Sequence, residues 1–484
     1  MTEVPEAAGC VKRVARATLM SHTGNMRFIV LLLAPVFAGL ASVALAREPA
    51  PPVPGDPDIA KIVSEISAGR IERSIRILTS FTTRHTLSDP SPGGNGIGAA
   101  SAWLYAELER IADASNGRLQ VGLDVFQQPG APGIPKPVAI TNIVATLPGT
   151  QPESSNRIYV LCSHYDSCSS NPLDFESPAP GADDDASGVA AMIELASVMS
   201  HHEFKATIVF LAVAGEEQGL YGSAHWAAQA KQNKLNIAGV INNDIIGSTR
   251  AEDGVDDSLT VRLFAQGVPP GVAHGDGLGT LLAAGGENDT PPRELARAIR
   301  EASVLYVPSM SVKIIYRADR FLGKGDQQSF LDQGYPAVRL TEPAEDFRHQ
   351  RQDVRVENGV AYGDTADLMN FAYVADVARV NAAALAVLAR APASPRGAQI
   401  ETARLENDTT LDWQPNAEPD LAGYRIVWRD TAASIWEHAI EVPKTVTRYT
   451  LRNISKDNFI FGVESVDAAG HVSPAAYPLP GPRP

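Results

Sequence analysis

Four segments of the sequence carry clusters of residues that can bind a metal ion. They read HYDS (164–167), GADDDASG (181–188), AGEEQGLYGS (214–223) and NNDIIG (242–247). Imidazole and carboxylate groups together form a ligand set suited to zinc. Carboxylates gathered at one place repel each other unless a cation lies among them. One acidic loop alone is typical of a solvated helix N-cap, but the co-occurrence of all four segments predicts a metal site.

Short apolar runs lead into three of these segments and are typical of buried strands. They are IYVLCSH (158–164), ATIVFLAVAG (206–215) and IAGVINND (237–244), and helical spacing follows in GVAAMIELASVMS (188–200) and GLYGSAHWAAQAKQ (219–232). Strands that alternate with helices predict an α/β fold with a mostly parallel or mixed central sheet flanked by helices. In such a sheet, ligands bind at the carboxyl ends of the strands. His164, Glu216, Glu217 and Asp244 all stand at such positions.

The remaining elements divide the chain into segments. Helical patterns cover 62–81, 99–113 and 365–390, and further strands are expected at 309–317 and 335–342. APASPRG marks a linker over 392–398. Beyond it, alternating strands without a helix predict a small antiparallel β-sandwich over 399–484.

The N-terminal residues resemble an export signal. The uncharged stretch Phe28 to Ala46 follows Arg27 and ends in Ala-Leu-Ala, a small-x-small cleavage site. Residues 1–46 are therefore assigned to the signal, with a true start at Met20 or Met26. A Pro-rich linker (47–58) and the domain 59–391 follow. An uncleaved membrane anchor at 28–46 is the alternative, and no later segment is expected to cross a membrane.

Composition excludes some classes of protein. The chain has 484 residues, of which 44% are hydrophobic and 20% charged, so general disorder is excluded. The net charge of -15 argues against nucleic acid as a partner. Export leaves Cys162 and Cys168, which could pair in an oxidising compartment or remain two buried thiols.

The four segments, in this order and at these gaps, resemble metallopeptidase family 28, which includes secreted bacterial leucyl aminopeptidases and aminopeptidase Y. The resemblance extends from about Ile71 to Ala391. It implies a zinc-dependent exopeptidase fold with two zinc ions per chain. By this resemblance, His164 and Asp244 hold one ion, Glu217 and His349 hold the other, and Asp184 bridges them.

The resemblance also assigns two carboxylates that do not bind metal. Glu216 would be the general base that takes a proton from the bridging water and passes it to the leaving amine. Asp166 would orient the imidazole of His164. His349, in EDFRHQRQD, occupies the slot of the family's last histidine. The chain departs from the family in GDQQSF (325–330), where a histidine is usual and this chain has Gln327 and Gln328, and the oxyanion donor remains unassigned.

These expectations define an exported di-zinc exopeptidase, periplasmic or extracellular, that hydrolyses N-terminal peptide bonds of peptides or proteins. The alternatives are a carboxypeptidase or dipeptidase of the same family, a glutaminyl cyclase-like enzyme, and a non-catalytic binding protein. The C-terminal segment resembles a fibronectin type III module through Trp413, Tyr424 and its strand pattern. It would contact a surface or polymer, or act as a spacer.

Overall fold

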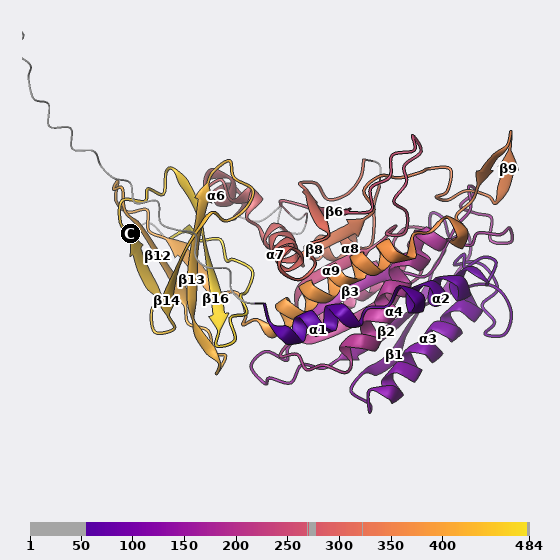
Figure 1. Ribbon diagram of the computed structural model, residues 1–484, viewed down its shortest axis with the longest axis horizontal. Coiled ribbons are helices and arrows are strands. Elements are labelled where there is room, and N and C mark those ends of the chain that lie inside the picture. Colours follow the sequence, from indigo (N-terminus) through magenta and orange to yellow (C-terminus); the bar gives the residue numbers. More distant parts are fainter. Residues whose placement is uncertain (1–54, 269, 271–276, 322, 482–484) are drawn as a thin grey trace, which may run out of the picture. The chain divides into compact units, whose positions relative to one another are not determined.

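An eight-stranded mixed sheet lies at the centre of this computed structural model (Figure 1), in the order β1-β2-β4-β3-β5-β8-β6-β7. The structure describes residues 55–268, 270, 277–321 and 323–481. The predicted signal (1–46) and most of the predicted linker (47–58) therefore lie outside the described residues. The described residues belong to one compact unit, Val53–Pro484.

Four neighbouring strands in the middle of the sheet are parallel: β4 (Thr207–Val213), β3 (Arg157–His164), β5 (Asn236–Asn243) and β8 (Ala337–Thr341). Their carboxyl ends consequently meet at one edge of the sheet. The outer strands are β1 (Gln120–Gln128), β2 (Val138–Leu147), β6 (Thr260–Ala265) and β7 (Ser311–Ile315). Antiparallel pairing joins β2 to β4 and β6 to β8, so the sheet is mixed as predicted.

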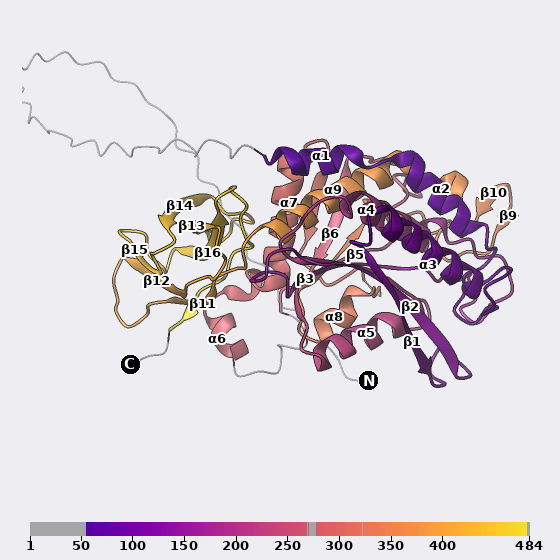
Figure 2. The same ribbon diagram turned by 90° about the horizontal axis from the view of Figure 1, so that it is seen from below.

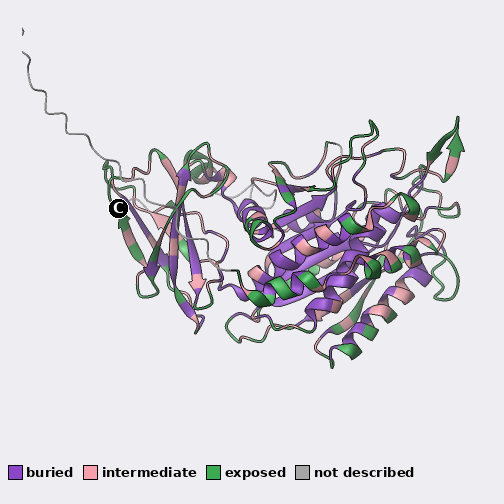
Figure 3. Cartoon of the chain, viewed as in Figure 1, coloured by how far each residue is buried: buried purple, intermediate pink, exposed green. Residues whose placement is uncertain are grey.

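Helices cover both faces of the sheet, as Figure 2 shows. One face carries α1 (Pro57–Glu65), α2 (Ala68–Thr79), α3 (Ile97–Ala114), α4 (Ser187–Met199), α7 (Pro291–Tyr306) and α9 (Phe371–Arg390). The other face carries α5 (Tyr221–Gln232) and α8 (Gln327–Asp332). Separate apolar clusters fill the space on each side. Figure 3 shows the strands and the inner faces of the helices as buried.

Helix α9 corrects one expectation about membranes. It is long and apolar enough to cross a bilayer, although no segment after the signal was expected to be. Its most apolar window is 72% buried inside the protein, which is the behaviour of a core helix. Small side chains such as Ala378, Ala382 and Ala386 are fully buried and allow α9 to pack closely against α1, α4 and α7.

The C-terminal residues form two small sheets. One has the order β15-β12-β11-β17 and the other β14-β13-β16. Their strands are β11 (Arg396–Ile400), β12 (Thr409–Gln414), β13 (Leu421–Asp430), β14 (His438–Pro443), β15 (Arg448–Leu451), β16 (Phe459–Asp467) and β17 (Leu479–Pro480). Trp413 and Tyr424 meet edge to face in their shared core, with ring centroids 5.3 Å apart. Strand β11 begins inside the predicted linker 392–398, as α1 begins inside the linker 47–58.

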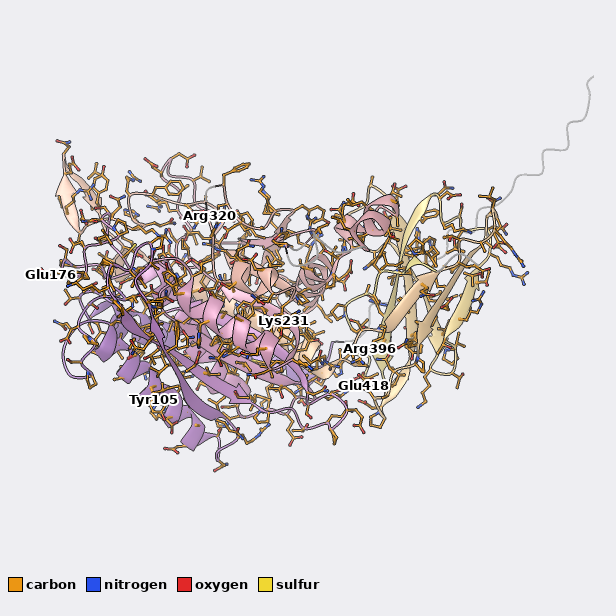
Figure 4. All side chains as sticks on the ribbon, turned by 180° about the vertical axis from the view of Figure 1, so that it is seen from behind. Tyr105, Glu176, Lys231, Arg320, Arg396 and Glu418 are labelled. Atoms are coloured by element: carbon orange, nitrogen blue, oxygen red, sulfur yellow. The ribbon has the colours of Figure 1, made fainter. Side chains whose placement is uncertain are left out.

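Buried polar contacts join the C-terminal sheets to the α/β domain. Arg429 of β13 donates two hydrogen bonds, of 2.6 and 2.8 Å, to Asp289 just before α7. Trp436 donates to Glu294 of α7 at 3.2 Å. At the other end of the junction Arg157 lies 3.4 Å from Glu418, which is labelled in Figure 4. The two domains therefore share a desolvated, ion-paired boundary.

The remaining described elements are short. They are η1 (Ala182–Ala186), α6 (Gly277–Ala283), η2 (Gly286–Asn288), β9 (Arg355–Glu357), β10 (Val360–Tyr362) and η3 (Ala366–Leu368). The hairpin β9–β10 is largely exposed (Figure 3). It follows the loop that carries His349, so this loop lies between β8 and an exposed hairpin.

Candidate metal centre

The parallel strands bring three predicted ligands to one edge of the sheet. His164 is the last residue of β3, Glu217 follows β4 by four residues, and Asp244 directly follows β5. All three are buried, although they carry charge or a ring nitrogen. Gly215 allows the sharp turn after β4, because its φ of 78° lies in the left-handed region that favours glycine.

The three aspartates of the GADDDASG segment have different roles. Asp185 accepts hydrogen bonds from the backbone N–H groups of Gly188 (3.0 Å) and His164 (3.3 Å). Asp183 accepts from the backbone of Gly247 at 2.7 Å. Of the three carboxylates, that of Asp184, the middle acid, lies beside the imidazole of His164. The outer acids thus fix the segment to neighbouring backbone, and the middle acid is left to act as a metal ligand.

One group of ligands surrounds His164. Its Nε2 lies 3.1 Å from Asp184 Oδ1 and 3.9 Å from Asp244 Oδ1. Arg339 of β8 lies 3.0 Å from Asp244 Oδ1 and also 3.0 Å from Asp319. Arg339 therefore balances part of the negative charge of Asp244.

A second group lies on the other side of Asp184. Its Oδ2 accepts a hydrogen bond from Arg351 Nε at 3.2 Å, and Arg351 Nη2 lies 2.9 Å from Glu217 Oε2. Glu216 Oε2 is 3.6 Å from the same nitrogen. The two oxygens of Asp184 thus face two different groups, which is the arrangement that a bridging ligand requires.

Asp166 contacts residues of both groups. Its carboxylate lies 3.5 Å from His164 Nδ1 and accepts backbone hydrogen bonds from Glu216 (3.3 Å) and Glu217 (3.2 Å). Thr86 donates a further bond at 3.1 Å. His164 Nδ1 donates its hydrogen bond to the backbone carbonyl oxygen of Asp166 at 3.1 Å. Orientation of the imidazole by the Asp166 carboxylate therefore stays a prediction, and the hold on the Glu216–Glu217 backbone is seen only in the structure.

His349 is the predicted ligand that the structure does not bring to the cluster. Its Nδ1 is 3.5 Å from Asp346 Oδ2, and its side chain is 26% exposed. Within the described residues, the contacts to Glu217 and Asp184 from this loop come from Arg351, two positions later. The assignment of His349 to the second ion therefore stays a prediction, and Arg351 is the residue that sequence reasoning missed.

The ligand atoms are suited to a cation. Among the described residues, His164 Nε2, Asp184 Oδ1 and Glu217 Oε1 are buried and make no hydrogen bond, whereas Glu217 Oε2 is paired with Arg351. Buried polar atoms without partners are costly unless a ligand satisfies them. His164, Glu216 and Asp244 also offer ligand atoms within 4.8 Å of one another. Glu216, predicted to be the general base, thus stands among the atoms that could hold a metal ion.

Burial dominates the electrostatics of these groups. It raises the pKa of Glu216 well above the ordinary value and that of Glu217 to about 7. Burial also opposes ionisation of Asp184, but Arg351 and His164 together lower the pKa of this carboxyl. The pKa of Asp244 is likewise lowered against burial, chiefly by Arg339.

Some supporting residues carry no recognisable sequence signal. Asp364 accepts hydrogen bonds from the backbone of Asp183 (2.7 Å) and of Asp184 (2.8 Å), from almost two hundred positions away. Gln327, in the segment where the family usually has a histidine, donates to Asp319 at 2.8 Å. It therefore orients the carboxylate that pairs with Arg339 rather than reaching the ligands.

The backbone is strained next to one predicted ligand. Ile245, which follows Asp244, has a φ of 61°, which is rare for a β-branched residue, and such strain clusters at functional sites.

The two cysteines are not joined. Cys162 and Cys168 are both free thiols. The pairing left open by the sequence is thus not formed in the structure.

Comparison with known proteins agrees with this geometry. The profile of "Peptidase family M28" matches residues 142–369. A "Probable zinc metalloprotease" of Pyrenophora teres f. teres is 46% identical over 430 residues, covering 89% of this chain and 88% of the relative. A similarly described protein of Leptosphaeria maculans is 47% identical over 439 residues, covering 91% of this chain and 100% of the relative.

A solved structure shares the fold. The Legionella pneumophila LapA aminopeptidase superposes with a TM-score of 0.51 at 19% identity, covering 72% of this chain and 78% of that one. The two sequence relatives are fungal, so the bacterial subtype expected from the sequence stays a prediction. Because these relatives match about nine-tenths of its length, the chain belongs to peptidase family M28.

Proposed function

We propose that this protein is an exported aminopeptidase that uses two zinc ions. The observation that carries the proposal is the position of Asp184, whose Oδ1 lies beside His164 and whose Oδ2 pairs with Arg351, the same side chain that pairs with Glu217. One carboxylate between two ligand groups suits a pair of ions better than a single ion. His164 and Asp244 would hold the first ion, and Glu217 with His349 the second.

The protein's own residues would supply the proton transfer. When bound, two zinc ions would lower the pKa of a shared water and polarise the peptide carbonyl. Glu216 is buried beside His164 and Asp244, and burial raises its pKa, which makes its carboxylate a stronger base than an exposed one. Glu216 would then deliver this proton to the nitrogen of the departing amine. Asp166 would keep Glu216 in place through its backbone N–H.

Metal content and substrate choice test the proposal. The chain from residue 47 onwards is purified, and its zinc is counted by mass spectrometry. Two ions per chain are expected, and a value near one would refute the two-ion centre. Hydrolysis of aminoacyl-anilides is compared with hydrolysis of N-blocked peptides. Cleavage of blocked peptides alone would favour the carboxypeptidase alternative.

Two variants separate the assigned roles. Glu216→Gln is expected to keep both ions and to lose turnover by about a hundredfold or more, as for the loss of a general base. His349→Ala is expected to lose one ion. His201→Ala, which changes an exposed histidine outside the site, serves as its control. Two ions in His349→Ala would remove His349 from the ligand set.

Export and the role of the C-terminal sheets are part of the same proposal. Cleavage after Ala46 would release the mature chain, and N-terminal sequencing of the exported protein tests it. A mature chain that retains 28–46 would favour the membrane anchor. The C-terminal sheets would form a fibronectin type III-like domain with Trp413 and Tyr424 in its core.

A further inference from the structure

Arg351 places a positive charge where the second zinc ion is proposed to bind. Its guanidinium lies 2.9 Å from Glu217 Oε2 and donates to Asp184 Oδ2 at 3.2 Å. It also lies 3.6 Å from Glu216 Oε2. No other described side chain forms an ion pair with Glu217.

The contact follows from the chemistry of the three carboxylates. Each is almost fully buried, with side-chain exposures of 1 to 3%. Several buried carboxylates close together repel one another and need a cation. The planar guanidinium, with its fork of N–H donors, can serve several carboxylates at once. Arg351 thus provides the charge balance that a divalent ion would otherwise provide.

The backbone of Arg351 is an independent sign of this role. Its φ is 50°, in the left-handed region that non-glycine residues rarely adopt. Such a conformation persists only where the surroundings compensate for its cost. Contacts with Asp184 and Glu217 offer that compensation, and a loop held in this way can change when they are replaced.

We propose that the Arg351 guanidinium and the second zinc ion compete for the carboxylates of Asp184 and Glu217, so that this ion binds only in exchange for the arginine. The inference rests on the two-ion function proposed above. His349 lies two positions earlier on the same loop, so departure of the guanidinium leaves Glu217 open to the imidazole. Arg351 is therefore a positioning residue that regulates how the second subsite fills.

Zinc titration of the stripped full-length chain tests the exchange. In Arg351→Gln the second ion no longer displaces a cation, so it is expected to bind about tenfold more tightly, the equivalent of one ion-pair contact of about 1.4 kcal/mol. The matched control is Arg110→Gln, which changes an exposed arginine of α3 that pairs with Glu107 at 2.6 Å. The control is expected to titrate as the wild type does.

Thermal stability gives a readout that needs neither zinc nor activity. Stripped Arg351→Gln is expected to melt below the stripped wild type, because three buried carboxylates lose their counter-ion, and to regain the difference when zinc is added. Arg351→Lys serves if the glutamine variant does not fold. Its compact ammonium keeps the positive charge but lacks the planar fork of the guanidinium, so the second ion is expected to bind with intermediate affinity.

The outcomes distinguish this inference from the proposed function. Two ions in the wild type, with the second bound equally well or more weakly in both Arg351 variants, would overturn the exchange and leave the two-ion function intact. One ion in wild type and variants alike would overturn both. One ion in the wild type and two in Arg351→Gln would refute the two-ion centre of the wild type and would support the competition between the guanidinium and the ion.

Discussion

Replacing Asp166 with asparagine tests how the site is held together. The carboxylate of Asp166 is fully buried and receives three donors: the backbone N–H groups of Glu216 and Glu217 and the hydroxyl of Thr86. Asparagine has nearly the same shape but only one accepting oxygen. In either orientation its NH₂ group meets one of the two backbone N–H groups, and that donor loses its partner.

The size of the effect follows from this count. An unsatisfied buried N–H costs about 1–3 kcal/mol. About 1.4 kcal/mol corresponds to a factor of ten, so the expected loss is about tenfold to a hundredfold. Loss of an outer partner of a metal ligand typically weakens metal affinity by a similar 10–100-fold, roughly. The loss should appear in zinc affinity, because the Asp166 carboxylate holds the backbone N–H of the proposed ligand Glu217.

Competition between the stripped protein and a chromophoric zinc chelator measures this affinity. Asp174→Asn is the matched control, because Asp174 also accepts hydrogen bonds from two backbone N–H groups, of Glu176 and Ser177, but in a loop outside the site. Zinc affinity of Asp166→Asn within twofold of the wild type would refute the reasoning. A loss of similar size in Asp174→Asn would show that the assay reports general stability instead.

Three further results are expected. Arg429→Met removes both hydrogen bonds from Arg429 to the buried carboxylate of Asp289, which keeps only Arg297 at 3.2 Å, and should lower the free energy of unfolding by about 1.5–3 kcal/mol in urea titrations; a loss below about 1 kcal/mol, as for an exposed pair, would contradict this. Burial opposes protonation of His471, but hydrogen bonds to Asp467 and Asp56 raise its pKa, so its stabilising contribution is complete below the unfolded-state value of 6.5 and is lost as pH rises through the folded-state pKa. The melting-temperature gap between wild type and His471→Asn should therefore be larger at about pH 6 than at about pH 9, and an equal gap would count against it. Removal of metal with a chelator should abolish peptide hydrolysis and lower the melting temperature, with recovery on addition of zinc; hydrolysis that survives complete removal would exclude metal catalysis.

The central strands could be predicted because burial on both faces leaves a continuous apolar run. The segments at 158–164 and 206–215 carry such runs; β4 lies within the second, and β3 begins one residue before the first. Parallel pairing then determines that His164 and the Glu216–Glu217 pair share an edge. The prediction of a buried charged cluster thus follows from elementary sheet geometry.

The edge of the sheet was harder to predict. Strand β1 is only partly covered, and Leu123 and Val125 are more than half exposed. Its sequence QVGLDVFQQ lacks both an apolar run and a buried apolar face. The first strand expected from the sequence was therefore 158–164. Strand β6 was missed as well, in the segment between Asp244 and the next predicted strand.

The loop after β8 shows what a motif does not contain. The match of His349 to the family's last histidine depends on spacing, but the direction of a side chain in an irregular loop depends on contacts with distant residues. Arg351 reaches Asp184 across 167 positions. Asp364 reaches the backbone of the same residue across 180 positions. No periodic pattern in the sequence predicts such contacts, because each one forms between residues that only the complete fold brings together.

The ion-paired boundary between the two domains limits how the chain can be divided. A protein that ended at Ala391 would keep every proposed zinc ligand, yet it would expose Asp289, Glu294 and Arg157 and remove their partners across the boundary. Among the described side chains, Arg297 alone would remain beside the two carboxylates. Likewise, the C-terminal sheets fused to another protein would carry an uncompensated Arg429. The C-terminal domain is thus a poor candidate for exchange between proteins as a free module, and changes on either side of the boundary should occur in pairs.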